Sequence, residues 1–96
     1  MTTTFKRFEF SCDWVSKFEA QCILGIREAQ LRNDTAILLD LNTPGFDYIR
    51  YSDKGYGKKS MLALIEFRKL SEEKGRTRAI QEINQHMEAF WHEYQG

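Results

Sequence analysis

The sequence predicts an α+β fold, a two-layer sandwich in which helices pack on a small three-stranded sheet. Apolar residues repeat at spacings of three and four over Arg76–Tyr94, which is typical of a long amphipathic helix. Short apolar runs bounded by turn residues recur in the first half of the chain and are typical of strands. The expected order of elements is β-α-β-β-α-α in one compact domain, residues 1–96.

The first strand and the first helix are expected before residue 33. Phe5–Phe10 alternates like a strand, and either Ser11 or Asp13 can cap the helix predicted over Trp14–Arg32. Gly25 lies inside this predicted helix, where it costs about 1 kcal/mol relative to Ala. The residues expected on the buried face of the helix are Val15, Phe18, Cys22, Ile26 and Ala29.

An antiparallel hairpin is expected next. Thr35–Leu41 is apolar on both faces, which favours an inner strand, and Asp47–Ser52 follows as its partner. A turn over Pro44–Phe46 joins them and places Leu41 opposite Ile49, the register that buries apolar side chains on one face.

The second half of the chain is expected to be a loop followed by two helices. Asp53–Ser60 is the loop, and a helix begins at Lys58 or Ser60 and ends at Lys74. Gly75 suits the C-terminal cap of that helix. The helix over Arg76–Tyr94 then closes the core.

Composition limits the classes of function. The chain has 96 residues, with 14 Lys and Arg against 14 Asp and Glu, so it lacks the basic excess typical of nucleic-acid binders. No apolar run predicts a secretion signal or a membrane span, and free thiols at Cys12 and Cys22 suit the cytoplasm, where we expect the protein. Aromatic residues make up 14% of the chain, which favours a protein-binding role.

One loop is a candidate site for a phosphate-bearing ligand. It lies between a predicted strand and a predicted helix, where glycines and free helix amides can bind anions. Its residues are Lys54, Gly55, Tyr56, Gly57, Lys58, Lys59 and Ser60. At Lys54, Gly55 and Gly57 the loop is similar to the pyrophosphate loop of GNAT acetyltransferases, which implies acyl-CoA or nucleotide binding. Lys59 departs from that family at its final small position, and a helix follows where the family has a strand.

Metal binding and catalysis have little support in the sequence. His86 and His92 are six residues apart and point about 120° away from each other around a helix, so they do not share a metal. Serines, cysteines and carboxylates lack a recognisable nucleophile setting. We therefore expect no metal and no cofactor, and the pattern leans away from an enzyme.

The favoured function is protein binding. The final helix ends in an aromatic cluster whose expected interface residues are Met87, Phe90, Trp91 and Tyr94. In size and style the chain resembles small phage or mobile-element proteins that act as inhibitors or adaptors of a larger partner. Nucleic-acid binding is the less favoured alternative, through Tyr48 and Arg50 on one face of the predicted hairpin.

A homodimer is also predicted. Residues 80, 83, 87, 90 and 94 have the spacing used by helices that pair across a two-fold axis, and a narrow sheet leaves one helix to be covered by a second chain. Replacing Trp91 with Ala is expected to weaken association by about 2 kcal/mol or more while keeping the helical circular dichroism. Light scattering at micromolar concentration tests the dimer, and a mass of 11.4 kDa independent of concentration would reject it.

Overall fold

The computed structural model describes residues 14–49 and 54–94. In this part of the chain there are four helices and one two-stranded antiparallel sheet, so the predicted three-stranded sandwich is wrong. The elements are β1 (Trp14–Ser16), α2 (Lys17–Leu24), α3 (Glu28–Asp40), β2 (Gly55–Gly57), α4 (Lys58–Lys74) and α5 (Arg76–Glu93).

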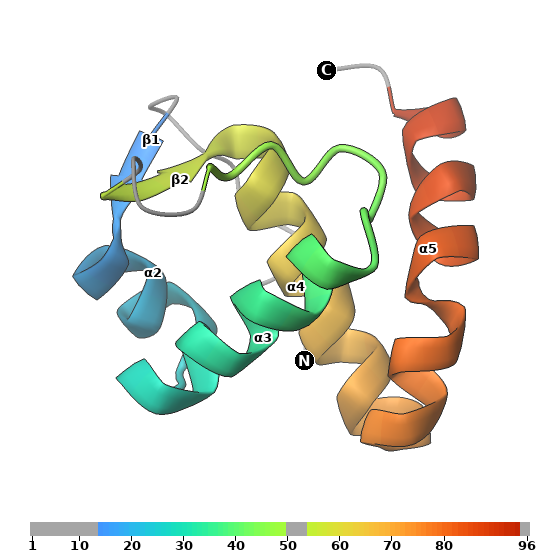
Figure 1. The fold of residues 1–96 in the computed structure, drawn as a ribbon, viewed down its shortest axis with the longest axis horizontal. Helices are drawn as coiled ribbons and strands as arrows, with labels where there is room; N and C mark the ends of the chain where they lie inside the picture. The colour runs from blue at the N-terminus through green and yellow to red at the C-terminus, as the bar shows by residue number, and fades with distance from the viewer. Residues whose placement is uncertain (1–13, 50–53, 95–96) are drawn as a thin grey trace, which may run out of the picture.

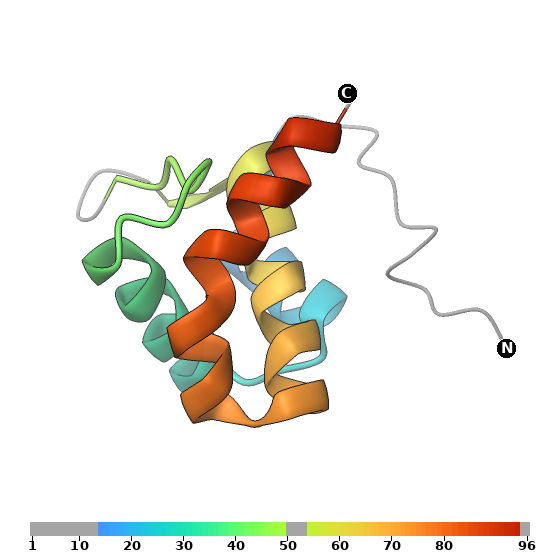
Figure 2. The ribbon, with the colours of Figure 1, turned by 90° about the vertical axis from the view of Figure 1, so that its right-hand side faces the viewer.

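The helix α4 is central to the arrangement (Figure 1). The small sheet and α2 lie on one side of it and α5 lies on the other, while α3 crosses below the sheet. Turning the molecule shows α4 and α5 as an antiparallel pair joined by a tight connection (Figure 2). No helix described between residues 14 and 94 is long and apolar enough to cross a membrane.

The first described helix begins later than predicted because Ser16 forms a capping box. The Glu19 amide donates to the Ser16 hydroxyl at 3.0 Å, and the Ser16 amide donates to the Glu19 carboxylate at 2.8 Å. Two orphan amides are satisfied reciprocally, so the helix starts at Lys17. Trp14–Ser16 is therefore free to pair as a strand, although it was predicted to be helical.

Gly25 ends this helix and does not lie inside a longer one. Its φ of +68° is left-handed, and its amide donates to the carbonyl of Gln21 as a C-terminal cap. The predicted helix over Trp14–Arg32 is thus divided into α2 and the beginning of α3. Cys22 and Phe18, which were expected to be buried, are exposed.

The predicted strand Thr35–Leu41 is wrong, because α3 continues through it to Asp40. The buried residues of α3 are Leu31, Asp34, Thr35 and Leu38, at helical spacings of three and four. Thr35–Leu41 is apolar on most sides. Such a pattern does not distinguish a strand from a buried helix.

The predicted hairpin is also absent from the described residues. Asn42 adopts a left-handed φ of 54°, and the chain from Phe46 to Ile49 is irregular rather than strand. Asp47 is held by Ser60, which accepts a hydrogen bond from the Asp47 amide at 3.1 Å and donates one to its carboxylate. The rest of the predicted partner strand and the predicted strand Phe5–Phe10 lie outside the described residues.

The observed sheet joins segments that are far apart in the sequence. β1 pairs antiparallel with β2, with Val15 opposite Tyr56 and Ser16 opposite Gly55. The β2 residues were predicted to be loop. A side chain at position 55 would collide with the Val15 carbonyl and the Trp14 ring, so this close pairing requires glycine.

The predictions for the last two helices are confirmed. α4 ends at Lys74, and the Gly75 amide caps it by donating to the Ser71 carbonyl at 2.9 Å. α5 follows at once and packs back along α4. The fully buried side chains between them include Phe67, Leu64, Ile83 and Met87.

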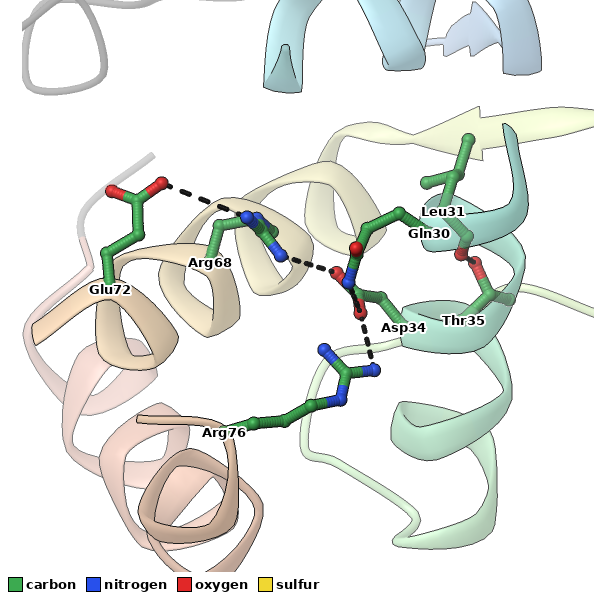
Figure 3. A network of polar contacts seen from close by, with 7 residues as sticks. All are labelled: Gln30, Leu31, Asp34, Thr35, Arg68, Glu72 and Arg76. Carbon is green, nitrogen blue, oxygen red and sulfur yellow. Dashed lines mark hydrogen bonds and ion pairs between the residues drawn. The ribbon is translucent and has the colours of Figure 1, made fainter. Parts of the chain in front are cut away.

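A buried carboxylate links three helices (Figure 3). Asp34 on α3 is 0% exposed and lies 3.0 Å from Arg76 of α5 and 3.7 Å from Arg68 of α4. With its side-chain oxygen turned toward the guanidinium groups, Gln30 accepts from Arg68 at 3.3 Å and from Arg76 at 3.0 Å. The charge of Asp34 is compensated by two cations, as a buried charge requires.

Replacing Asp34 with Asn should lower the free energy of unfolding by about 3 kcal/mol, because two arginines would lose their buried partner. Urea unfolding followed by circular dichroism measures this. The matched control is Glu72→Gln, since Glu72 is 63% exposed and pairs with Arg68 at 3.9 Å at the edge of the same network. The control should lose less than about 1 kcal/mol. Equal losses in the two variants would contradict a central role for Asp34.

Candidate functional site

A cavity lies between α2, α3 and β2, on the sheet side of the molecule. Its volume is about 570 Å³, within the range of about 300–1,000 Å³ that is usual for small-ligand sites. Its lining combines aromatic residues with charged side chains.

The aromatic part of the wall is a pair of tyrosines. Tyr48 and Tyr56 are both buried, and their rings stack with centroids 4.8 Å apart and planes 26° apart. Phe46 also packs against Tyr48, with ring centroids 6.2 Å apart. The register of the sheet fixes Tyr56, because Tyr56 pairs with the buried Val15.

A short hydrogen-bond chain holds the end of Tyr56. The Thr35 hydroxyl lies 2.8 Å from the Tyr56 hydroxyl and 2.8 Å from the carbonyl oxygen of Leu31. Thr35 and Leu31 also line the cavity. Burial raises the pKa of Tyr56 above its usual value, so its hydroxyl keeps its proton at neutral pH.

The charged residues at the cavity are three cations and one carboxylate: Lys17, Arg32, Lys54 and Glu28. Ser16 pairs with Gly55 at one end of the antiparallel sheet. Lys17 directly follows Ser16 and Lys54 directly precedes Gly55, so both lysines lie at this end. Two segments nearly forty positions apart therefore bring two ammonium groups to one end of the sheet.

Lys17 connects this rim to the aromatic wall. Its ammonium nitrogen lies 5.6 Å from the centre of the Tyr48 ring, a cation–π distance. A hydrogen bond to Tyr48 raises the pKa of Lys17, against the opposing effect of desolvation. Lys17 is therefore a cation at neutral pH.

The loop predicted to bind phosphate is divided by the structure. Lys54 and Tyr56 line the cavity, whereas Gly55 and Gly57 pair as strand residues. Gly57 is also the N-cap of α4, but neither it nor the residues that follow it line the cavity. Lys58 and Lys59 begin α4. The Lys59 ammonium nitrogen lies 5.8 Å from the centre of the Trp91 ring. Ser60 is buried and is hydrogen-bonded to Asp47. The helix amides and the two pocket residues thus do not form one site.

Sequence reasoning missed the remaining pocket residues. Lys17, Arg32 and Thr35 were assigned to helix or strand positions without a chemical role, and Tyr48 was noted only as a residue that could stack on bases. No local signal could have grouped them, because the grouping depends on the pairing of β1 with β2.

The predicted interface residues have roles within the chain. Met87 is fully buried, and Phe90, Trp91 and Tyr94 form a half-buried ring cluster. The Trp91 indole N–H donates to the Pro44 carbonyl at 2.6 Å, and its ring packs so closely on Gly45 that any side chain there would collide. Trp91 therefore holds the connection after α3, and the three-stranded sheet on which the dimer prediction was based is not observed.

Other apolar side chains are exposed instead. The exposed large hydrophobic residues among those described are Trp14 (51%), Phe18 (71%) and Ile49 (60%). Phe18 is on the first turn of α2, directly after Lys17, so apolar surface adjoins the charged rim of the cavity.

Among the described residues, the two histidines and Cys22 do not form a metal site. Over residues 14–49 and 54–94, no three His, Cys, Asp or Glu side chains are grouped suitably for a metal. His86 lies 2.7 Å from Glu66 of α4. Cys22 is a free, exposed thiol.

Comparison of the chain with models of known protein families, with curated proteins and with solved structures gave no match.

Replacing Trp91 with Phe tests its role within the chain. The variant keeps a ring on Gly45 but loses the indole donor to Pro44, which should lower the free energy of unfolding by about 1 kcal/mol. Thermal unfolding measures the stability, and light scattering measures the mass of the same sample. Unchanged stability together with a lower mass would instead indicate that Trp91 acts at an interface between chains.

Proposed function

We propose that this chain is a small binding protein whose cavity takes an anionic ligand. The observation that carries the proposal is the arrangement of Lys17, Arg32 and Lys54 around a cavity walled by Tyr48 and Tyr56. The proposal keeps the anion site expected from the sequence at Lys54 and Tyr56. It replaces the remainder of that loop with residues from α2 and α3.

The charges at the cavity favour an anion. Glu28 is the one carboxylate in the lining, and it pairs with Arg32 at 3.7 Å. Both side chains of this pair are well exposed, so the pair contributes little. Among the described residues, no carboxylate forms an ion pair with Lys54. A ligand anion would supply that partner.

Burial of an aromatic wall beside this charge adds to the proposal. An ion pair formed at the edge of a cavity is less screened by water than one on an open surface. Tyr48 and Tyr56 are only 8% and 2% exposed, so they would add a small apolar contact. In this proposal the protein works in the cytoplasm and binds its ligand without transforming it.

A second candidate function is the binding of a larger protein, in the manner of a phage-type inhibitor or adaptor. The exposed side chains of Trp14, Phe18 and Ile49 favour it, because exposed aromatic residues often anchor interfaces. A partner that covers Phe18 would also approach Lys17. If the partner is a second copy of this chain, the complex is the predicted homodimer.

Isothermal titration calorimetry tests the primary proposal. The probes are acetyl-CoA, CoA, nucleoside mono-, di- and triphosphates, phenyl phosphate and citrate. We expect at least one of these anions to bind with a dissociation constant in the micromolar range. Lys54→Glu should weaken that binding by at least about tenfold, equivalent to about 1.4 kcal/mol.

The matched control is Lys74→Glu, which makes the same charge change at the end of α4 and disturbs an exposed ion pair with Glu82. Its effect on the dissociation constant should stay below about twofold, since the Debye length at physiological salt is only about 8 Å. Equal weakening in the two variants would place the anion outside the cavity, and no binding by any probe would refute the proposal.

A further inference from the structure

The accessible part of the cavity is its rim. Tyr48 and Tyr56 are buried and stack on each other, and the Lys17 ammonium lies over the Tyr48 ring. Leu31 and Thr35 are buried as well. A ligand in the cavity therefore meets chiefly the charged side chains at the opening. Ion pairs that remain in contact with water contribute little each, so a tightly bound ligand needs apolar contact outside the cavity.

The helix α2 places apolar surface directly beside this rim. Lys17 and Gln21 are one turn apart on α2, and both line the cavity. Phe18 and Cys22 follow them by one position each, so they form the neighbouring ridge, about 100° around the helix. Both residues are exposed, Phe18 to 71%. A polar ridge at the cavity and an apolar ridge at the surface thus run side by side along α2.

The apolar ridge takes no part in the core of the protein. The buried residues of α2 are Ala20 and Leu24, which lie on the side of the helix opposite Phe18 and Cys22. A surface helix typically has one apolar face directed to the core and a polar face directed to water. Because α2 has apolar side chains on both sides, it offers apolar surface to a binding partner.

The charge of the neighbouring rim selects the kind of partner. Lys17, Arg32 and Lys54 bring positive charge to the opening of the cavity, and the lining contains one carboxylate, that of Glu28. Complementary charges across an interface direct the approach of a partner and suppress partners of the same sign. A segment that covers Phe18 and lies along this rim must therefore carry carboxylates on the side that faces the cavity.

We propose that the anion is carried by an acidic peptide segment of a partner protein, with its carboxylates at Lys17 and Lys54 and an apolar side chain on Phe18. An extended peptide in which acidic and apolar residues alternate presents the two kinds on opposite sides, so it can contact a polar and an apolar ridge together. The cations line a concave opening, which favours a peptide chain over the flat surface of a bilayer. This inference rests on the proposed anion-binding function.

Calorimetry with synthetic peptides tests the inference. The probe is a short peptide of alternating aspartate and leucine, and its companions carry serine in place of leucine or lysine in place of aspartate. Citrate serves as the small anion. The peptide of aspartate and leucine should bind at least about tenfold tighter than citrate and than the serine peptide. The lysine peptide should not bind, because its charge has the sign of the rim.

Substitutions in the protein separate the apolar contact from the charged one. Phe18→Ser should weaken binding of the acidic peptide by at least about tenfold while leaving citrate binding unchanged, and Phe18→Leu should restore most of the affinity. Phe18 is well exposed, so these variants are expected to fold. Lys54→Glu should weaken the peptide by at least about tenfold and the control Lys74→Glu by less than about twofold. Full affinity in Phe18→Ser would overturn the inference.

Protection of Cys22 gives a readout that a small anion does not share. The chain has two cysteines, so Cys22 is the remaining thiol in the variant Cys12→Ser. Cys22 is exposed, and iodoacetamide should alkylate it. A saturating concentration of the acidic peptide should suppress this alkylation, whereas saturating citrate should leave its rate unchanged. Undiminished alkylation with the peptide bound would place the peptide elsewhere and overturn the inference.

The inference and the anion-binding function fail in different ways. If citrate binds and Lys54→Glu weakens it, but the acidic peptide binds no tighter than citrate, only the inference is overturned. If neither the peptide nor any small anion binds, the anion-binding function falls as well. Binding to vesicles of anionic phospholipid that Phe18→Ser weakens, without binding of the peptide, would overturn the inference in favour of a membrane surface.

Discussion

The fold depends on one buried carboxylate. Asp34 is fully buried on α3 and is approached by Arg68 from α4 and by Arg76 from α5 (Figure 3). A buried charge is tolerated only where opposite charges meet it, so burying Asp34 requires all three helices in this arrangement. The contribution is therefore one of specificity: packings that keep the same apolar contacts but separate Asp34 from its arginines leave an uncompensated charge inside the protein.

The position of α3 has consequences for the cavity. Since Asp34 anchors the middle of α3 to the α4–α5 pair, Leu31 and Thr35, each within three residues of it, face the sheet side. The far end of α3 is held separately, because Asn84 of α5 donates to the Leu41 carbonyl at 2.7 Å. α2 and the two strands lie on the side of α4 away from α5 (Figure 1). The cavity is lined by residues of α2, α3 and β2.

The parts of the fold that sequence could predict are those determined by neighbours in the chain. α4 and α5 have long helical periodicity and a glycine between them, and both features are local. The strand predicted at Thr35–Leu41 failed because its apolar pattern fits helix and strand equally, and the burial of Asp34 is invisible without its two distant arginines. Lys54 and Tyr56 could be named as candidate site residues from their loop, whereas Lys17 is placed beside Lys54 only by a pairing of three residues on each side.

That small sheet also links ligand binding to stability. Three residue pairs are too few to be stable by themselves, so the β1–β2 pairing depends on what packs around it. Tyr56 contributes through Thr35, and Lys17 contributes through Tyr48. These same side chains form the walls of the cavity, and Lys17 and Lys54 lie at the end of the sheet where like charges repel.

A bound anion would remove this repulsion and bridge α2 to β2. By linkage, the protein would gain stability in proportion to the logarithm of ligand concentration above the dissociation constant. The gain would appear first in the sheet and α2, because the Asp34 network already holds the other three helices together.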